Sequence, residues 1–284
     1  MDRRHRSRYR PQLDVLEDRL SPGSLGHTGI FDPGHRHDPL AAVGQAGALL
    51  DLSPSAPQGA QANPDVFPVN SRPFGMTYGQ WSAAWWQWAT SLPADQHPLF
   101  DTADCSAGQS GHVWFLGGTF VVSETATQDF VGVADRSCTV PTGTALFFPI
   151  LNAEASTAEG NGTTEAKLRA SAQAAVDGTT SLQATIDGRP IENLASYRVQ
   201  SPLFTYGPVP DNNIFQALGE NVPAGTTSLS AADGYYVMLR PLSAGQHTIH
   251  FSASAVIGQK PDGSPATFTL DITYHLHVVP HHAA

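Results

Sequence analysis

Charged residues are scarce in this chain of 284 residues, at 14% against roughly 25% in ordinary soluble domains. Positive charge is the scarcest: 15 Lys and Arg stand against 25 Asp and Glu, which gives a formal net charge of −10. Nucleic-acid binding needs a basic face, so this balance argues against nucleic acid as the main partner. No stretch approaches about 18 consecutive apolar residues, and we therefore expect no membrane-spanning helix.

Motifs of the common enzyme classes are missing as well. The sequence has no G-x-S-x-G elbow, no glycine-rich phosphate loop with a lysine and no H-E-x-x-H pair. The run Gly108-Gln109-Ser110-Gly111 has the wrong spacing for a nucleophile elbow and follows no predicted strand. These absences weigh against the large hydrolase and nucleotide-dependent classes. The sequence leans away from catalysis and leaves rarer enzyme classes open.

Cysteine is limited to Cys105 and Cys138. Two cysteines in a chain with the features of an exported protein favour one disulfide. The bond would close a loop of about 34 residues and stabilise the fold by roughly 3–4 kcal/mol. Two buried free thiols are the alternative. A cysteine nucleophile is not favoured, because no companion His and acid can be identified.

The charge that is present is unevenly distributed. Residues 1–22 hold six Arg, whereas the rest of the chain is acidic. Residues 16–22 (LEDRLSP) resemble the LEDRL-S/T-P segment at the start of many proteins of planctomycete-type bacteria that are predicted to be exported. That resemblance implies an extracellular or cell-surface location. The alternative is a short amphipathic helix on a basic arm.

Composition divides the chain into three parts. Residues 1–22 form a basic, targeting-like segment. Residues 23–74 are rich in Gly, Pro, Ala and Ser and show no sustained period, so they cannot bury enough apolar surface to offset their ordering entropy. We interpret them as a disordered linker. Residues 75–280 then make up a single folded domain.

A tryptophan-rich helix is predicted at the start of that domain. Thr77 and Gln80 form a capping box, and Pro93 ends the helix. Helical spacing puts Trp81, Trp85 and Trp88 on one stripe, which favours burial against a sheet over a stacking platform for sugars. Trp86 lies off the stripe and is the better candidate for a surface contact.

The rest of the domain is mainly strand, with one further helix between Thr164 and Gly178. In the last two strands apolar and polar residues alternate. Both apolar sets must face one core, so odd residues of one strand stand opposite even residues of the other. Pro149 predicts that its strand, residues 144–151, is irregular or lies at the edge of a sheet. We predict an antiparallel β-sandwich, immunoglobulin-like or jelly-roll-like, with both helices packed on it. The predicted strands are residues 112–122, 144–151, 181–186, 197–206, 235–242, 246–257 and 267–279.

Two further resemblances bear on the fold. Residues 241–249 (PLSAGQHTI) resemble the segment that precedes the last hairpin of immunoglobulin-like domains. Three segments of the body resemble a family of uncharacterised bacterial proteins predicted to be secreted: residues 81–88 (WSAAWWQW), 108–116 (GQSGHVWFL) and 138–152, from CTVP to LFFPILN. This resemblance implies secretion and a shared fold. It transfers no catalytic residue.

One candidate metal site lies on the last two strands. His275 and His277 point to one face because strand side chains repeat every two residues, and His250 shares that face by the pairing above. Three imidazoles on adjacent strands can bind Zn²⁺ or Cu²⁺. Solvent-exposed strand histidines are the alternative. His281 and His282 follow closely.

A second candidate site lies at a strand end. Asn152, Glu154 and Glu159 follow a hydrophobic run, and with Asp101 or His97 they would provide a Ca²⁺ site or an acid–base pair. The alternative is a cap on the following loop and helix. Beyond Ca²⁺ or Zn²⁺ at these two places, the sequence indicates no cofactor.

Three functional hypotheses follow. The first, which we prefer, is an exported β-sandwich protein that binds a glycan or an envelope partner without catalysis. The second is a secreted hydrolase that uses Glu154 with Asp101 or His97. The third is a metal-binding protein that uses His250, His275 and His277. The sequence leaves the ligand and the oligomeric state open.

Overall fold

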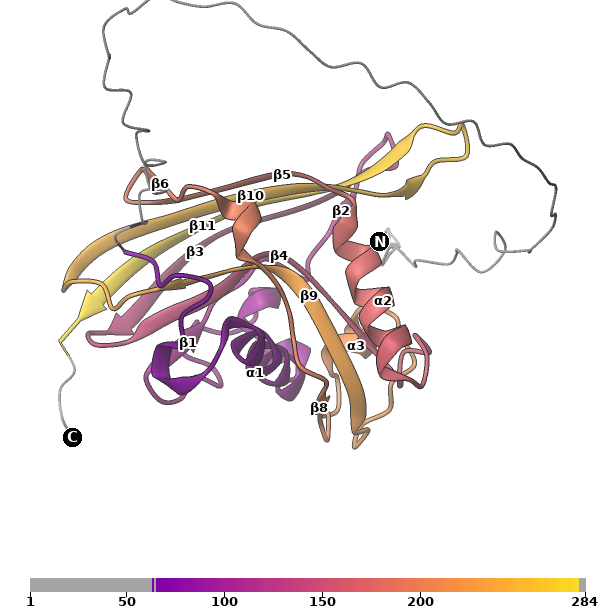
Figure 1. Ribbon diagram of the computed structural model, residues 1–284, viewed down its shortest axis with the longest axis horizontal. Coiled ribbons are helices and arrows are strands. Elements are labelled where there is room, and N and C mark those ends of the chain that lie inside the picture. Colours follow the sequence, from indigo (N-terminus) through magenta and orange to yellow (C-terminus); the bar gives the residue numbers. More distant parts are fainter. Residues whose placement is uncertain (1–62, 64, 281–284) are drawn as a thin grey trace, which may run out of the picture. The chain divides into compact units, whose positions relative to one another are not determined.

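Two β-sheets lie face to face in the computed structural model, which describes Asn63 and residues 65–280 (Figure 1). The segment 1–22, most of the expected linker, His281 and His282 lie outside the described residues. Sheet A has the order β1 (Val113–Phe115), β4 (Ala145–Ser156), β9 (Ser228–Leu239) and β7 (Arg198–Gln200), and β8 (Phe204–Tyr206) also pairs with β9. Sheet B has the order β2 (Ser123–Glu124), β3 (Phe130–Pro141), β11 (Pro265–Val279), β10 (Gly245–Gln259), β5 (Thr179–Ile186) and β6 (Arg189–Pro190).

Helices cover sheet A. In Figure 1, α1 lies on the side of sheet A away from sheet B, and α2 packs against β4 and β9. None of the described helices is long and apolar enough to cross a membrane. The two sheets and the helices packed on sheet A confirm the predicted mainly-β sandwich with packed helices. The helices are α1 (Tyr78–Ser91), α2 (Glu165–Asp177) and α3 (Ile214–Ala217), with 3-10 turns at Pro73–Gly75, Ala94–Gln96, Pro98–Phe100 and Leu194–Tyr197.

The C-terminal hairpin forms as predicted. Ile249 stands opposite Tyr274 and Phe251 opposite Ile272, so odd residues of β10 do face even residues of β11. All four side chains are buried. The ring of Phe251 stacks on Phe148 of β4 at 5.2 Å between centroids, which ties sheet B to sheet A. The alternation of apolar and polar residues was sufficient to predict this part of the core.

Strand β3 was not predicted, and it changes the sheet. It pairs in parallel with β11, as β1 does with β4, so the sandwich is mixed and not purely antiparallel. Its inward-facing row includes Gly132, Arg136 and Cys138 in place of large aliphatic residues. A glycine and a charge in the buried row conceal the period-two pattern on which strand prediction depends.

Other boundaries also differ from the predictions. Of residues 112–122 only β1 is a strand, and the chain that follows passes close to α1 at Gly117, where a Cβ atom would lie 2.8 Å from Trp85. Pro149 sits beside a bulge in a central strand, so the expected irregularity is present but the strand is not an edge. Residues 65–74, expected in the linker, pack on the body: Val66 is buried and bridges Leu239.

The expected disulfide is present. Cys105 and Cys138 are bonded, with their Cα atoms 5.7 Å apart. The bond attaches the segment between α1 and β1 to the inward face of β3. It closes the loop that the sequence predicted.

Candidate functional site

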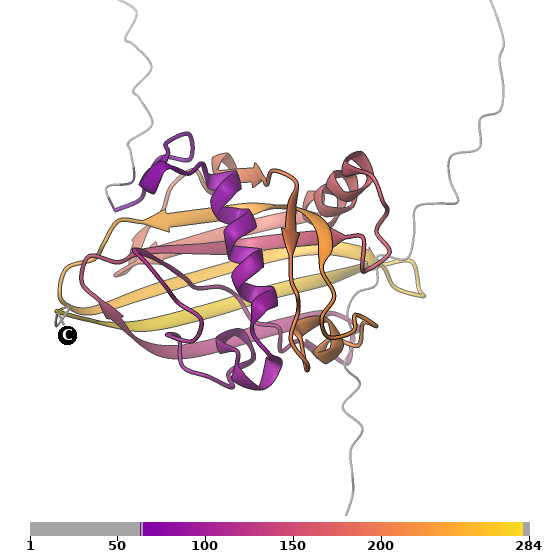
Figure 2. The ribbon, with the colours of Figure 1, turned by 90° about the horizontal axis from the view of Figure 1, so that it is seen from below.

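The tryptophan stripe of α1 is structural, as predicted. The capping box is formed, with Thr77 accepting from the Gln80 amide and Gln80 accepting from the Thr77 amide. Figure 2 shows α1 lying across the strands of sheet A. Each stripe indole donates to a backbone carbonyl outside the helix, and these bonds attach the helix to the segments that flank it. The bonds run from Trp81 to Pro73 at 3.0 Å, from Trp85 to Leu116 at 2.7 Å and from Trp88 to Ala107 at 3.2 Å.

The prediction of Trp86 as a surface residue is wrong. Only 8% of Trp86 is exposed, and its ring packs edge-on against Trp85 at 5.0 Å between centroids. The helix contacts β9 and β8 as well as β4, Trp86 lies beside Tyr236 of β9, and Gln87 donates to the Thr205 carbonyl of β8. The helix is therefore covered on a second side that its periodicity does not reveal.

Asn152 and Glu154 belong to a buried polar cluster between β4, β9 and β8. Ser230 donates to Glu154 at 2.7 Å, and Asn152 donates to the hydroxyl of Tyr236 at 3.3 Å. Burial, together with the nearby Glu154 carboxylate, raises the pKa of Tyr206. These groups are satisfied inside the fold, with Glu154 only 7% exposed. The arrangement fits a structural network better than a site that admits substrate.

His97 is fully enclosed, at 0% exposure. The Leu99 amide donates to its Nδ1 atom at 3.0 Å, so its Nε2 atom carries the proton and donates to the Ala89 carbonyl, also at 3.0 Å. Burial lowers the pKa of His97 to about 4, although the bond to Ala89 acts in the opposite direction. The imidazole is thus neutral near pH 7, and both ring nitrogens are occupied.

This burial predicts a loss of stability in mild acid. The unfolded chain protonates His97 below about pH 6.5 and the folded chain only below about pH 4, so the free energy of unfolding should fall as the pH drops between these values. At pH 5 the loss due to His97 should be about 2 kcal/mol. Urea unfolding of the native chain and of His97→Gln at pH 7.5 and pH 5 measures it.

Two variants are compared with the native chain in that measurement. His97→Gln should lose about 2 kcal/mol less than the native chain between the two pH values. The exposed control His275→Gln should lose as much as the native chain. Equal losses in all three proteins would show that His97 is not the acid-sensitive group.

Asp101 pairs with Arg136 of β3 and not with another acid. The Arg136 Nε atom lies 2.6 Å from the Asp101 carboxylate, and its Nη1 atom donates to the Gly118 carbonyl at 2.7 Å and to the Tyr274 hydroxyl at 2.9 Å. Arg136 is 8% exposed. The sequence singled out Asp101 but gave no sign of its partner, because β3 itself was missed.

The expected histidine metal site does not form as a cluster. His250, His275 and His277 do share the outer face of sheet B, as parity predicted. His250, however, lies 3.0 Å from Asp271, and His275 lies 3.0 Å from Asp135. Within residues 65–280, no group of three or more His, Cys, Asp or Glu side chains is placed to hold a metal ion.

An aromatic patch, which sequence reasoning missed, lies at the start of α1 and consists of Phe67, Phe74, Trp81 and His112. The Phe74 ring is 49% exposed. Its plane is within 13° of the His112 ring, with centroids 6.5 Å apart, and its edge meets Trp81 at 6.4 Å. Arg240 lies over the Phe67 ring at 4.3 Å. An exposed aromatic residue that packs on half-buried rings is a common form of interaction site.

The backbone holds Phe74 in an unfavourable conformation. Its φ angle is 54°, in the left-handed region that bulky residues avoid. Such a conformation costs about 1–3 kcal/mol and persists where the surroundings enforce it, often at functional sites. Here it turns a large apolar side chain outward into solvent. The Pro73-Phe74-Gly75 turn was the one local signal for it in the sequence.

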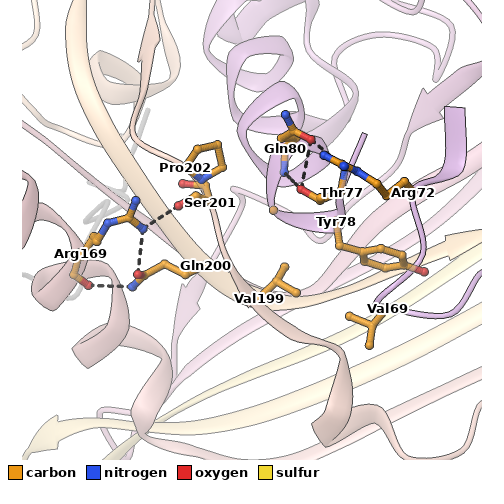
Figure 3. Close-up of a pocket in the computed structure, with 11 residues that line it drawn as sticks. Val69, Arg72, Thr77, Tyr78, Gln80, Arg169, Val199, Gln200, Ser201 and Pro202 are labelled. Atoms are coloured by element: carbon orange, nitrogen blue, oxygen red, sulfur yellow. Dashed lines mark hydrogen bonds between the residues drawn. The ribbon is translucent and has the colours of Figure 1, made fainter. Parts of the chain in front are cut away.

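A groove lined by both polar and apolar residues lies at the start of α1, and Arg72 on its wall stands two residues before Phe74. The groove has a volume of about 600 Å³ and separates the start of α1 from β7 and α2. Figure 3 shows Arg72 and Gln80 on one side and Arg169 with Gln200 on the other. The groove is narrow at its base, because a Cβ atom on Gly79 would lie 2.6 Å from the Gln200 carbonyl oxygen.

Comparisons with known proteins returned nothing: no family model, no curated protein and no solved structure matches the chain. The resemblance to bacterial proteins predicted to be secreted therefore stays a prediction. The function has to be argued from the patch and the groove.

Proposed function

We propose that this chain is an extracellular or cell-surface protein that binds a glycan or another envelope component without catalysing a reaction. The exposed, conformationally constrained Phe74 ring is the observation that carries the proposal. The apolar faces of sugar rings pack on aromatic side chains, and Phe74 presents such a face beside His112. A rigid, preformed surface lowers the entropic cost of binding.

Other features support parts of this proposal. The disulfide is typical of proteins that fold in an oxidising compartment, which favours an extracellular location. An immunoglobulin-like relationship, suggested by residues 241–249, would fit a surface-binding protein. The contacts of Glu154, His97 and Asp101 favour binding over hydrolysis, since each side chain is already engaged by the fold.

Phe74→Gly tests the proposal sharply. Glycine adopts the left-handed conformation without strain, and this relief offsets the lost ring contacts and the greater freedom of the unfolded chain, so the stability of the variant should stay within about 1 kcal/mol of that of the native chain. It should nevertheless lose at least tenfold in affinity for the glycan that the native chain binds. The measurements are thermal unfolding and a glycan array of neutral and acidic polysaccharides, followed by calorimetry.

Val133→Ala is the matched control, because Val133 is an apolar residue that is 63% exposed and lies on β3 of sheet B, away from Phe74. It should leave binding unchanged. If the native chain binds none of the array, or if Phe74→Gly binds as well as the native chain, the proposal is wrong.

A further inference from the structure

An arginine stands on each wall of the groove at the start of α1. Arg72 is exposed on one wall, and Arg169, with 28% of its side chain exposed, stands on the other. None of the described residues that line the groove is acidic. In a chain with a formal net charge of −10, two arginines around one depression form an unusual local surface.

Arg169 is held in position before any ligand arrives. Its Nη1 atom donates to Gln200 Oε1 at 2.9 Å and to the Ser201 carbonyl at 2.7 Å, and Glu165 pairs with it at 2.8 Å. These contacts come from α2 on one side and from the end of β7 on the other. The Glu165 carboxylate accepts from both Nε and Nη2, so this edge of Arg169 is already occupied, and an incoming anion has to be bound mainly by Arg72.

Arg72 complements it from the other side of the groove. Arg72 has no carboxylate partner among residues 65–280, so its guanidinium remains available for an external anion. It stands two residues before Phe74 in the same turn, within about 7 Å along the backbone. Arg72 therefore links the turn that carries Phe74 to the wall of the groove.

We propose that the groove between Arg72 and Arg169 is an anion subsite and that the ligand is an acidic glycan, whose sugar rings carry carboxylate or sulfate groups. This inference rests on the proposed glycan-binding function and specifies its ligand class. Arginine forks bind planar carboxylates through two parallel hydrogen bonds, and they bind sulfate oxygens in a related way. The amide side chains of Gln80 and Gln200 supply further donors and acceptors for the ring hydroxyls.

Calorimetry on the full chain tests this with matched probes. The probes are a hexamer of galacturonic acid, its methyl ester, a heparin hexamer and cellohexaose. The acidic hexamer should bind at least tenfold more tightly than its ester, which has the same rings without the charge. Its affinity should fall between 20 mM and 500 mM NaCl, because the contact is electrostatic. Heparin carries both carboxylate and sulfate groups, so tighter binding of heparin than of galacturonate indicates a contribution from sulfate.

Arg72→Gln is the principal variant, because Arg72 is exposed and its loss should not affect folding. It should weaken binding of the acidic hexamer at least tenfold and leave the ester unaffected. Arg169→Gln should act in the same direction. Arg189→Gln is the control, because Arg189 is exposed and lies outside the groove.

The outcomes separate this inference from the proposed function. If the acid and its ester bind equally, if Arg72→Gln has no effect or if no acidic probe binds, the acidic subsite is wrong. Cellohexaose binding that Phe74→Gly abolishes, together with binding of the acidic hexamer that is no tighter than that of its ester and that Arg72→Gln leaves intact, would uphold glycan binding and overturn the anion subsite. Binding to none of the four probes would contradict both.

Discussion

Replacing Arg136 with methionine is expected to destabilise the folded chain by about 3–5 kcal/mol. The guanidinium is buried and serves several acceptors at once: the Asp101 carboxylate, the Gly117 and Gly118 carbonyls and the Tyr274 hydroxyl. Methionine fills a similar volume but donates nothing. The two carbonyls would then lose charge-assisted bonds in a place where water cannot readily replace them. Urea unfolding followed by tryptophan fluorescence measures the loss.

Two further variants show which part of this network matters. Asp101→Asn should cost only about 1 kcal/mol, because the Asp101 side chain is 46% exposed and water can take the place of its carboxylate beside Arg136. Arg136→Lys should fall between the two, since an ammonium keeps the charge but cannot reach the separate acceptors in one plane. If Asp101→Asn proves as damaging as Arg136→Met, the ion pair and not the carbonyl contacts dominates. A loss below about 1 kcal/mol in Arg136→Met would contradict the structural role altogether.

The same arginine shows where sequence reasoning reached its limit. The inward and outward faces of the hairpin of β10 and β11 were predictable, because Ile249, Phe251 and Ile272 alternate with polar neighbours that face water, whereas the exact register came from the structure. Strand β3 lies beside that hairpin but presents Arg136 and Gly132 to the interior. The side chains of β3 do alternate between a buried and an exposed face, but the buried positions are not consistently apolar, so the sequence does not show the alternation. Only tertiary contacts with Asp101 and Tyr274 make an inward charge acceptable.

The candidate site was less predictable than the fold for a related reason. Asn152, Glu154, His97 and Asp101 were chosen because polar groups beside hydrophobic runs often mark function, yet each is used by the fold. The groove joins Arg72 to Arg169, which no local pattern connects. Capping, helical stripes and strand alternation are local and could be predicted. Which surface residues meet across two elements depends on how α2 docks beside β7.

Removing the disulfide, by Cys105→Ala together with Cys138→Ala, should cost about 3–4 kcal/mol. The bond spans 33 residues of sequence and restricts the unfolded chain more than the folded one. Urea unfolding of this variant should match that of the native chain in a strong thiol reductant. A loss below about 1 kcal/mol would mean that other contacts already hold the loop.

The disulfide and the arginine should also be coupled. Asp101 and Cys105 lie in one loop, and Arg136 and Cys138 lie two residues apart on β3, so the ion pair and the disulfide attach the same segment to the same strand. Once one attachment is lost, the loop is partly free and the other holds less structure in place. The triple variant that combines Arg136→Met with both cysteine changes should therefore lose less than the sum of the separate losses, by about 1 kcal/mol or more. Strict additivity in this cycle would show that the two attachments stabilise independent parts of the fold.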